Sequence, residues 1–116
     1  MSLPETISAK TAKAPPTVDD LRLLVVPFCK KHSIAELEVF GSVAEGTAKP
    51  GSDVDLMVTF KEGWDGSLFD FVELKLELED LLGCPVDLLE RPHVESMKNP
   101  FKRRSILSCV LPIYAS

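Results

Sequence analysis

The sequence of 116 residues has no apolar run long enough to cross a membrane and no signal-peptide pattern. Cysteines are few, and Cys29, Cys84 and Cys109 are an odd number without any Cys-x-x-Cys pair. These absences argue against a membrane anchor, a disulfide framework and a zinc site. We therefore expect buried reduced thiols, no contact with membranes and a cytoplasmic location.

Basic charge is also scarce, because 18 Asp and Glu residues outnumber 13 Lys and Arg residues and leave a net charge of -5. Non-specific binding of DNA or RNA requires Lys and Arg over a broad face, so direct nucleic-acid binding is not expected. The net charge does not exclude a local basic patch. The run Lys102-Arg103-Arg104 either contacts a nucleotide or an acidic partner, or forms the solvated face of a helix, which is the commoner case.

Length and composition indicate one compact domain. Apolar residues make up 45% and charged residues 27% of the chain, as in an ordinary globular protein. The segment Met1–Pro16 departs from this average, because it is polar, contains proline and has few large apolar groups. This composition predicts a flexible N-terminal arm over residues 1–16 and a folded domain over residues 17–116.

Helical periodicity begins directly after the N-terminal arm. Thr17 and Asp20 resemble a capping box in front of a helix over Val18–His32, which Pro27 either kinks or divides into two pieces. A second helix over residues 68–82 ends at a glycine. It has apolar residues on more than one face, which indicates either a partner surface or complete burial.

Strand-like alternation separates these helices. Three short strands are expected over residues 36–40, 54–58 and 85–90. Asn99-Pro100 then predicts the start of a last helix that runs through Leu107 and Val110, with Tyr114 as its furthest candidate residue. The order helix, strand, strand, helix, strand, helix predicts an α+β fold, an α/β sandwich with a small mixed sheet of three or four strands flanked by helices.

Two carboxylates stand out on the second expected strand. Asp53 and Asp55 leave the same face about 6.6 Å apart along the chain, which is close enough for both to reach one hard cation. Mg²⁺ is normally held by one or two carboxylates together with substrate phosphates, so the pair fits a metal completed by a nucleoside triphosphate. An isolated pair of this kind is more often only part of a solvated sheet face.

Two further features change that balance. Gly41-Ser42 ends the preceding strand, where a glycine lets the backbone approach a ligand and the following amides, if they open a short helix, point toward an anion. Asp87 lies on the third strand and would stand beside Asp55 if the two strands are neighbours. Three carboxylates around an anion-binding turn are the parts that two-metal nucleotidyl transfer requires.

Gly41-Ser42, ten intervening residues, Asp53-x-Asp55 and a later Asp87 together resemble the polymerase-β-type nucleotidyltransferase superfamily, in its minimal nucleotidyltransferase (MNT) branch. The resemblance covers about residues 18–115. It implies a nucleotidyltransferase palm fold, in which Gly41 and Ser42 hold the triphosphate. It also implies that Asp53 and Asp55 bind two Mg²⁺ ions, and that Asp87 completes the metal site and assists the nucleophile.

The same resemblance implies a reaction and a partner. Members of the MNT branch are commonly antitoxins that pair with a helical HEPN toxin, so the chain is expected to transfer AMP from ATP to a hydroxyl of a protein. One position departs from the family loop, where Glu45 stands in place of an arginine. Glu45 either repels the triphosphate or only alters an interface.

Two rival hypotheses therefore remain open. The chain could be an inactive member of the family that neutralises a toxin by complex formation alone. Separately, assembly of the chain into a homo-oligomer is also left open. A glycosyltransferase-like Asp-x-Asp site fits less well, because the chain is short for a nucleotide-sugar domain.

Overall fold

The structure is a computed structural model that describes residues 15–116. Of the expected N-terminal arm only Pro15 and Pro16 are described, and residues 1–14 lie outside the described part. The elements are α2 (Val18–Lys31), β1 (Ile34–Phe40), α3 (Gly41–Glu45), β2 (Val54–Phe60), α4 (Leu68–Leu82), β3 (Val86–Glu90), α5 (Arg91–Glu95), α6 (Pro100–Leu107) and β4 (Val110–Ala115). No helix within residues 15–116 has the length and apolarity needed to span a membrane.

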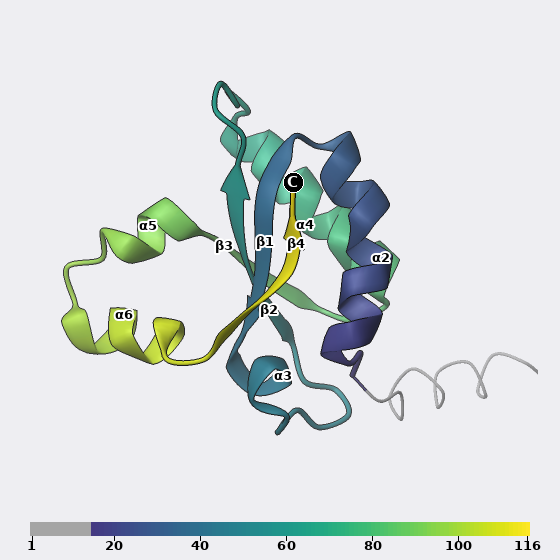
Figure 1. The fold of residues 1–116 in the computed structure, drawn as a ribbon, viewed down its shortest axis with the longest axis vertical. Coiled ribbons are helices and arrows are strands. Elements are labelled where there is room, and N and C mark those ends of the chain that lie inside the picture. Colours follow the sequence, from purple (N-terminus) through teal and green to yellow (C-terminus); the bar gives the residue numbers. More distant parts are fainter. Residues whose placement is uncertain (1–14) are drawn as a thin grey trace, which may run out of the picture.

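The four strands form one mixed sheet in the order β3-β2-β1-β4, flanked by helices (Figure 1). β1 is antiparallel to both β2 and β4, whereas β2 and β3 run parallel. The parallel pair is joined by α4, as such a crossover connection requires. The α+β prediction of a small mixed sheet flanked by helices is therefore confirmed.

The C-terminal end of the chain corrects one prediction. The last helix was expected to continue through Val110 toward Tyr114, but α6 ends at Leu107 and Val110–Ala115 is a strand. β-branched and aromatic side chains favour an extended backbone, and Pro112 cannot continue a helix. Pro112 is tolerated in β4 because β4 is an edge strand of the sheet.

Pro27 does not divide the first helix into two pieces. α2 is one helix that contains Pro27, and it begins with the expected capping box between Thr17 and Asp20. Leu21 and Phe28, on either side of the proline, are both buried in the core. Packing of this apolar face holds the helix together despite the proline.

The two faces of the sheet are covered differently. α2 and α4 cover one face, where 17 buried residues from all parts of the sheet and both helices form the main core. The short helices α5 and α6 lie on the opposite side of the sheet (Figure 1). Only Phe40, Met57 and Val94 are buried in the cluster there.

The exposure of α4 distinguishes between complete burial and a partner surface, the two explanations of its apolar pattern. Leu74 and Leu78 face the core, but Leu68 and Phe69 are 76% and 81% exposed and Leu76 is also exposed. Complete burial is therefore wrong for this helix, and its outer side presents an apolar stripe that no part of residues 15–116 covers.

Candidate active site

Asp55 and Asp87 are direct neighbours across the parallel pair of strands. The register of β2 and β3 sets Asp55 opposite Asp87, and Val54 and Leu56 opposite Val86 and Leu88. These four apolar side chains belong to the main core. Because side chains alternate along a strand, both aspartates point to the other face, the face of α5 and α6. Asp53 precedes β2 by one residue, so the structure brings the three expected carboxylates to one end of that face.

Gly41 lies against the carboxylate of Asp55. It follows β1, whose last residue Phe40 is paired with Asp55 across the antiparallel strands. A Cβ atom on Gly41 would overlap Oδ2 of Asp55 and stand 3.2 Å from its Cγ. Gly41 also has φ +69°, in the left-handed region that favours glycine. Both requirements explain why a glycine ends this strand.

The pKa of Asp55 is raised above its usual value. Burial of the carboxylate is the largest cause, and the negative charges of Asp87 and Asp53 add to it. Within residues 15–116, none of the ion pairs uses any of these three side chains. The described part of the chain therefore gathers three carboxylates without pairing them with a Lys or Arg side chain.

The donor set fits a hard divalent cation, because carboxylate oxygens are the protein ligands that Mg²⁺ prefers. As the side chains stand, residues 15–116 contain no ready-made cluster of three acidic, His or Cys groups in metal-binding geometry. This is compatible with Mg²⁺, which needs only one or two carboxylates and takes its other ligands from water and substrate phosphates. A bound cation would also relieve the repulsion that raises the pKa of Asp55.

The turn after β1 forms a short helix, as expected. α3 spans Gly41–Glu45 and ends at Gly46 in the left-handed conformation. The backbone carbonyl of Ser42 accepts a hydrogen bond from Thr47 N at 2.9 Å, which ties the loop to the helix. No hydrogen bond of the Ser42 hydroxyl is present within the described residues, and its side chain is half-buried beside Gly41.

Glu45 is placed away from the carboxylate cluster. Its side chain is exposed and lines a surface hollow with Pro16 and Val18, near the start of α2. The charges that raise the pKa of Asp55 are those of Asp87 and Asp53, and Glu45 is not among them. An exposed position next to the start of α2 is compatible with a role at an interface, whereas repulsion of a triphosphate held at Gly41 and Ser42 stays a prediction.

An ion pair that the sequence did not reveal crosses the same face. Arg91 Nη1 donates hydrogen bonds of 2.7 and 2.8 Å to both carboxylate oxygens of Glu38, whose side chain is only 13% exposed. This contact raises the pKa of Arg91. Arg91 is the first residue of α5, and Glu38 is paired with Met57 in the sheet. The ion pair holds α5 over β1 and β2. The sequence did not predict it, because the two residues are far apart in the chain and belong to no recognisable motif.

A second contact holds the strand that carries Asp87. Glu79 Oε2 accepts hydrogen bonds of 3.0 Å from Val86 N and from Lys75 Nζ. The hydrogen bond from the Val86 amide is the main reason why the pKa of Glu79 is lowered. Because Val86 directly precedes Asp87, α4 helps to set the position of the third carboxylate.

Comparison with known proteins agrees with this geometry. The profile of the nucleotidyltransferase domain family matches residues 22–112. MJ0435 of Methanocaldococcus jannaschii, assigned as a protein adenylyltransferase, is 40% identical over 72 residues, which are 62% of this chain and 75% of MJ0435. MntA of Thermococcus cleftensis, a protein adenylyltransferase, is 43% identical over 67 residues, which are 58% of this chain and 66% of MntA.

Solved structures give the same result for the fold. A protein described as a minimal nucleotidyltransferase is 37% identical, with a TM-score of 0.61 over 83% of this chain and 95% of that one. A toxin–antitoxin complex with AMP-PNP matches with a TM-score of 0.63 and 18% identity, over 82% of this chain and 73% of that chain. A Shewanella oneidensis complex of an MNT antitoxin with a tri-AMPylated HEPN toxin matches over 86% of this chain and 74% of that one, with a TM-score of 0.59 and 15% identity. The chain therefore belongs to the nucleotidyltransferase domain family, in its minimal nucleotidyltransferase branch, and is an enzyme of the nucleotidyltransferase class.

Proposed function

We propose that the protein transfers AMP from ATP to a hydroxyl group of a partner protein in a Mg²⁺-dependent reaction. The observation that supports this most strongly is the pairing of Asp55 with Asp87, with Gly41 packed against the Asp55 carboxylate. Relatives named protein adenylyltransferases support the choice of AMP and of a protein acceptor. We also assign this activity to one domain over residues 17–116.

Each residue of the site has a proposed role. Asp53, Asp55 and Asp87 would hold Mg²⁺, which when bound would neutralise the charge of the triphosphate. Gly41 and Ser42 hold the triphosphate, Gly41 by allowing close backbone approach and Ser42 by its hydroxyl. The acceptor oxygen forms a bond to the α-phosphorus, the bond to the bridging oxygen breaks, and pyrophosphate leaves. Asp87 accepts the proton of the attacking hydroxyl.

The partner proposed for this chain is a helical HEPN toxin. The support is indirect, since the fold resembles that of MNT antitoxins solved in complex with HEPN toxins. The chain would then be the antitoxin that modifies its toxin. The location proposed for this pair is the cytoplasm.

A test incubates the protein with the product of the adjacent gene, Mg²⁺ and ATP labelled either at the α- or at the γ-phosphate. The proposal predicts that only the α-label becomes attached to the partner. It also predicts that Asp53→Asn and Asp87→Asn abolish attachment, while the exposed-site control Asp65→Asn does not. Attachment of the γ-label, or equal labelling by the Asp87→Asn variant, would contradict the proposal.

The rival hypothesis is a binder without catalysis that neutralises its partner by complex formation. Its support is Glu45, which lies at the end of α3, the short helix that Gly41 and Ser42 begin. The α-label experiment separates the two, because a pure binder would associate with the partner without labelling it. Glu45→Arg serves as a check, since labelling by this variant but not by the wild type would support the rival hypothesis.

A further inference from the structure

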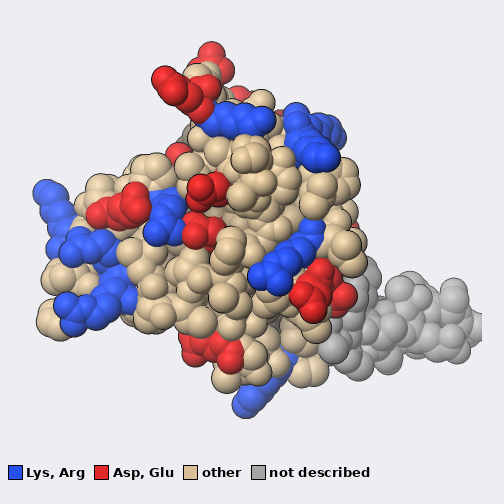
Figure 2. All heavy atoms as spheres, viewed as in Figure 1, with Lys and Arg blue, Asp and Glu red and all other residues tan. Residues whose placement is uncertain are grey.

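Residues 96–107, the turn after α5 and helix α6, form a basic region that we call the basic segment. It contains four of the 13 Lys and Arg residues and none of the 18 Asp and Glu residues, so the remainder of the chain has nine basic and 18 acidic residues. Figure 2 shows Lys and Arg side chains gathered at the edge of the molecule that α5 and α6 form. An ordinary solvated surface mixes basic and acidic side chains, whereas this segment carries basic side chains alone.

The cations of the basic segment are exposed and uncommitted. Lys98, Lys102 and Arg104 are exposed, and within residues 15–116 none of them takes part in an ion pair or a side-chain hydrogen bond. Phe101 lies between them and is 79% exposed. Aromatic residues and Arg are enriched in protein interfaces, so the exposed ring of Phe101 beside Arg104 indicates a docking surface.

The basic segment is held in a fixed shape. Asn99 caps α6, because its side chain accepts hydrogen bonds from the backbone amides of Phe101 and Lys102 at 3.0 and 3.2 Å. Arg103, the fourth cation, donates from Nη1 to the carbonyl oxygen of Met97 and so closes the turn. Docking on such a segment would cost little backbone conformational entropy.

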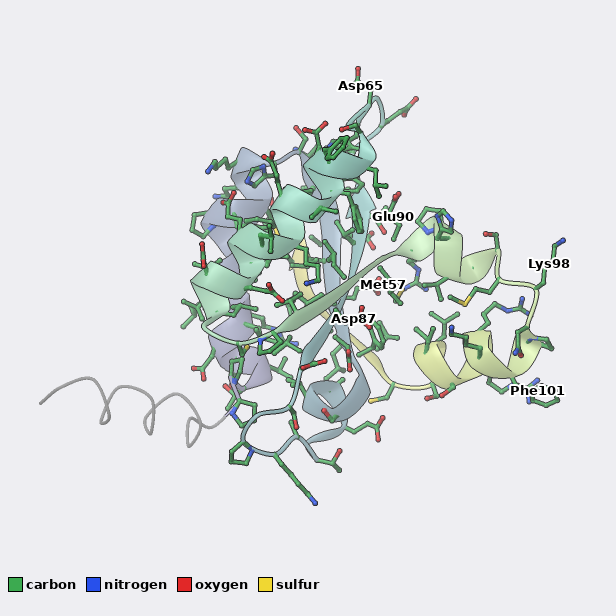
Figure 3. The ribbon with its side chains drawn as sticks, turned by 180° about the vertical axis from the view of Figure 1, so that it is seen from behind. Met57, Asp65, Asp87, Glu90, Lys98 and Phe101 are labelled. Atoms are coloured by element: carbon green, nitrogen blue, oxygen red, sulfur yellow. The ribbon has the colours of Figure 1, made fainter. Side chains whose placement is uncertain are left out.

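The segment also stands on the side of the sheet that carries the site. Ile106 and Leu107 pack against the cluster of Phe40 and Met57, and Phe40 is the strand partner of Asp55. Seen from behind, Lys98 and Phe101 lie at the outer end of α6 and point away from the sheet on which Asp87 lies (Figure 3). A protein bound over the carboxylates would meet this segment at its edge.

We propose that the basic segment docks an acidic, partly apolar surface of the acceptor protein and so aligns its hydroxyl with the Asp55 and Asp87 carboxylates. This inference rests on the proposed transfer to a protein hydroxyl. Charge complementarity selects an acidic surface, and Phe101 requires an apolar pocket or stripe within it. A nucleic acid is the less favoured occupant, because the acidic remainder of the chain repels phosphates beyond these few cations.

The test uses the full-length protein and two fluorescent probes. One is a helical peptide with glutamates on one face and leucines on the other, and the second is a single-stranded RNA of equal net charge. Binding is measured by fluorescence anisotropy in the wild type and in the triple variant Lys98→Glu, Lys102→Glu, Arg104→Glu. The matched control, Lys30→Glu, Lys49→Glu, Lys61→Glu, makes the same change of net charge at exposed lysines elsewhere.

We expect the basic-segment variant to bind the peptide about tenfold more weakly or worse, and the control variant to change binding by about twofold or less. Phe101→Ser should weaken binding without any change of charge. The glutamine version of the triple variant, which is milder toward folding, should give an intermediate loss. Equal binding by both triple variants, no peptide binding by the wild type, or tighter segment-dependent binding of the RNA would overturn the inference.

Thermal stabilisation by ATP and Mg²⁺ separates this inference from the proposed function. The basic-segment variant should keep that stabilisation, because its substitutions lie outside the carboxylate site. If the wild type shows no stabilisation by ATP while peptide binding still depends on the segment, the proposed function fails and the docking surface stands. If ATP stabilises all variants while the triple variants bind peptide equally, the docking surface fails alone.

Discussion

The sheet face covered by α2 and α4 and the face that carries Asp55 and Asp87 differ in what they bury. The covered face contains the main core of 17 buried residues, all apolar. On the open face, the buried residues among 15–116 are Phe40, Met57 and Val94, and beside them lie three carboxylates and the Glu38–Arg91 ion pair. A protein of this size can keep repelling charges on one face because the other face supplies most of the stability.

Replacement of the central carboxylate should have the largest effect on activity. We expect Asp55→Asn to slow AMP transfer by more than about 1,000-fold, which corresponds to about 4 kcal/mol of the activation barrier. The same substitution should raise the melting temperature of the ligand-free protein, because it removes a charge whose burial and neighbours oppose ionisation. Transfer assays and thermal melts test the two effects separately.

The stabilisation by Asp55→Asn should depend on pH, because the pKa of Asp55 is raised in the folded protein. Because the folded pKa of Asp55 is raised, the unfolded chain releases this proton at lower pH than the folded protein. Stability contributed by Asp55 therefore falls as pH rises through its folded pKa. The gap between the melting temperatures of Asp55→Asn and wild type should widen from about pH 4 to pH 7. A gap that is constant or reversed contradicts this prediction.

Truncation of the covered face should have the largest effect on stability. Leu78→Ala removes a fully buried side chain of α4 and should lower the free energy of unfolding by about 2–5 kcal/mol. Leu89→Ala, on the open face, should cost about 1 kcal/mol, because Leu89 is only partly buried there. Urea denaturation of both variants provides the measurement. Equal losses would show that the two faces do not differ as described.

Substitution of Gly41, which directly follows β1 and lies against Asp55, should show a smaller effect. Gly41→Ala places a Cβ in the left-handed region, at a cost of about 1–2 kcal/mol, and also pushes on the Asp55 carboxylate. Gly46→Ala is the matched control, since Gly46 has φ +77° and no atom near its Cβ position. Both variants should lose stability, but only Gly41→Ala should also lose AMP transfer. Equal transfer rates would remove Gly41 from the site.

The smallest effect is expected for substitution of Glu79. This residue lies on α4, on the covered side, and accepts a hydrogen bond from Val86, the residue before Asp87. Glu79→Gln weakens the contacts with Val86 and Lys75 and should lower the melting temperature slightly at neutral pH. Because the pKa of Glu79 is lowered in the folded protein, its contribution is present above the unfolded pKa of about 4.3 and is lost as pH falls through the folded pKa. The difference between variant and wild type should therefore vanish in acid. A difference that persists in acid would argue against this contact.

The sequence was sufficient for the elements that local patterns specify. The capping box at Thr17, the alternation around Asp55 and the cap at Gly83 all correspond to observed element boundaries. Asp87 was expected beside Asp55 on the condition that the two strands are neighbours, and the register of β2 and β3 meets that condition. These features depend on residues near one another in sequence or on one recognisable spacing.

Other features depend on contacts that no local pattern encodes. β4 was mistaken for the end of a helix, since its strand conformation depends on pairing with β1, some 70 residues earlier in the chain. The helix α5, only five residues long, was missed together with the Arg91–Glu38 ion pair, which joins residues 53 positions apart. The position of Glu45 near α2 likewise followed only from the folded structure.

The most direct test of the central claim, that the open face binds Mg²⁺ and ATP through its carboxylates, is a thermal-shift titration. ATP with Mg²⁺ at about 100 times the dissociation constant should stabilise the wild type by about 2.7 kcal/mol, and neither component alone should reach this value. Asp55→Asn and Asp87→Asn should lose the stabilisation, while Leu89→Ala should retain it. Stabilisation that is equal in both aspartate variants and the wild type, or absent from the wild type, would contradict the account.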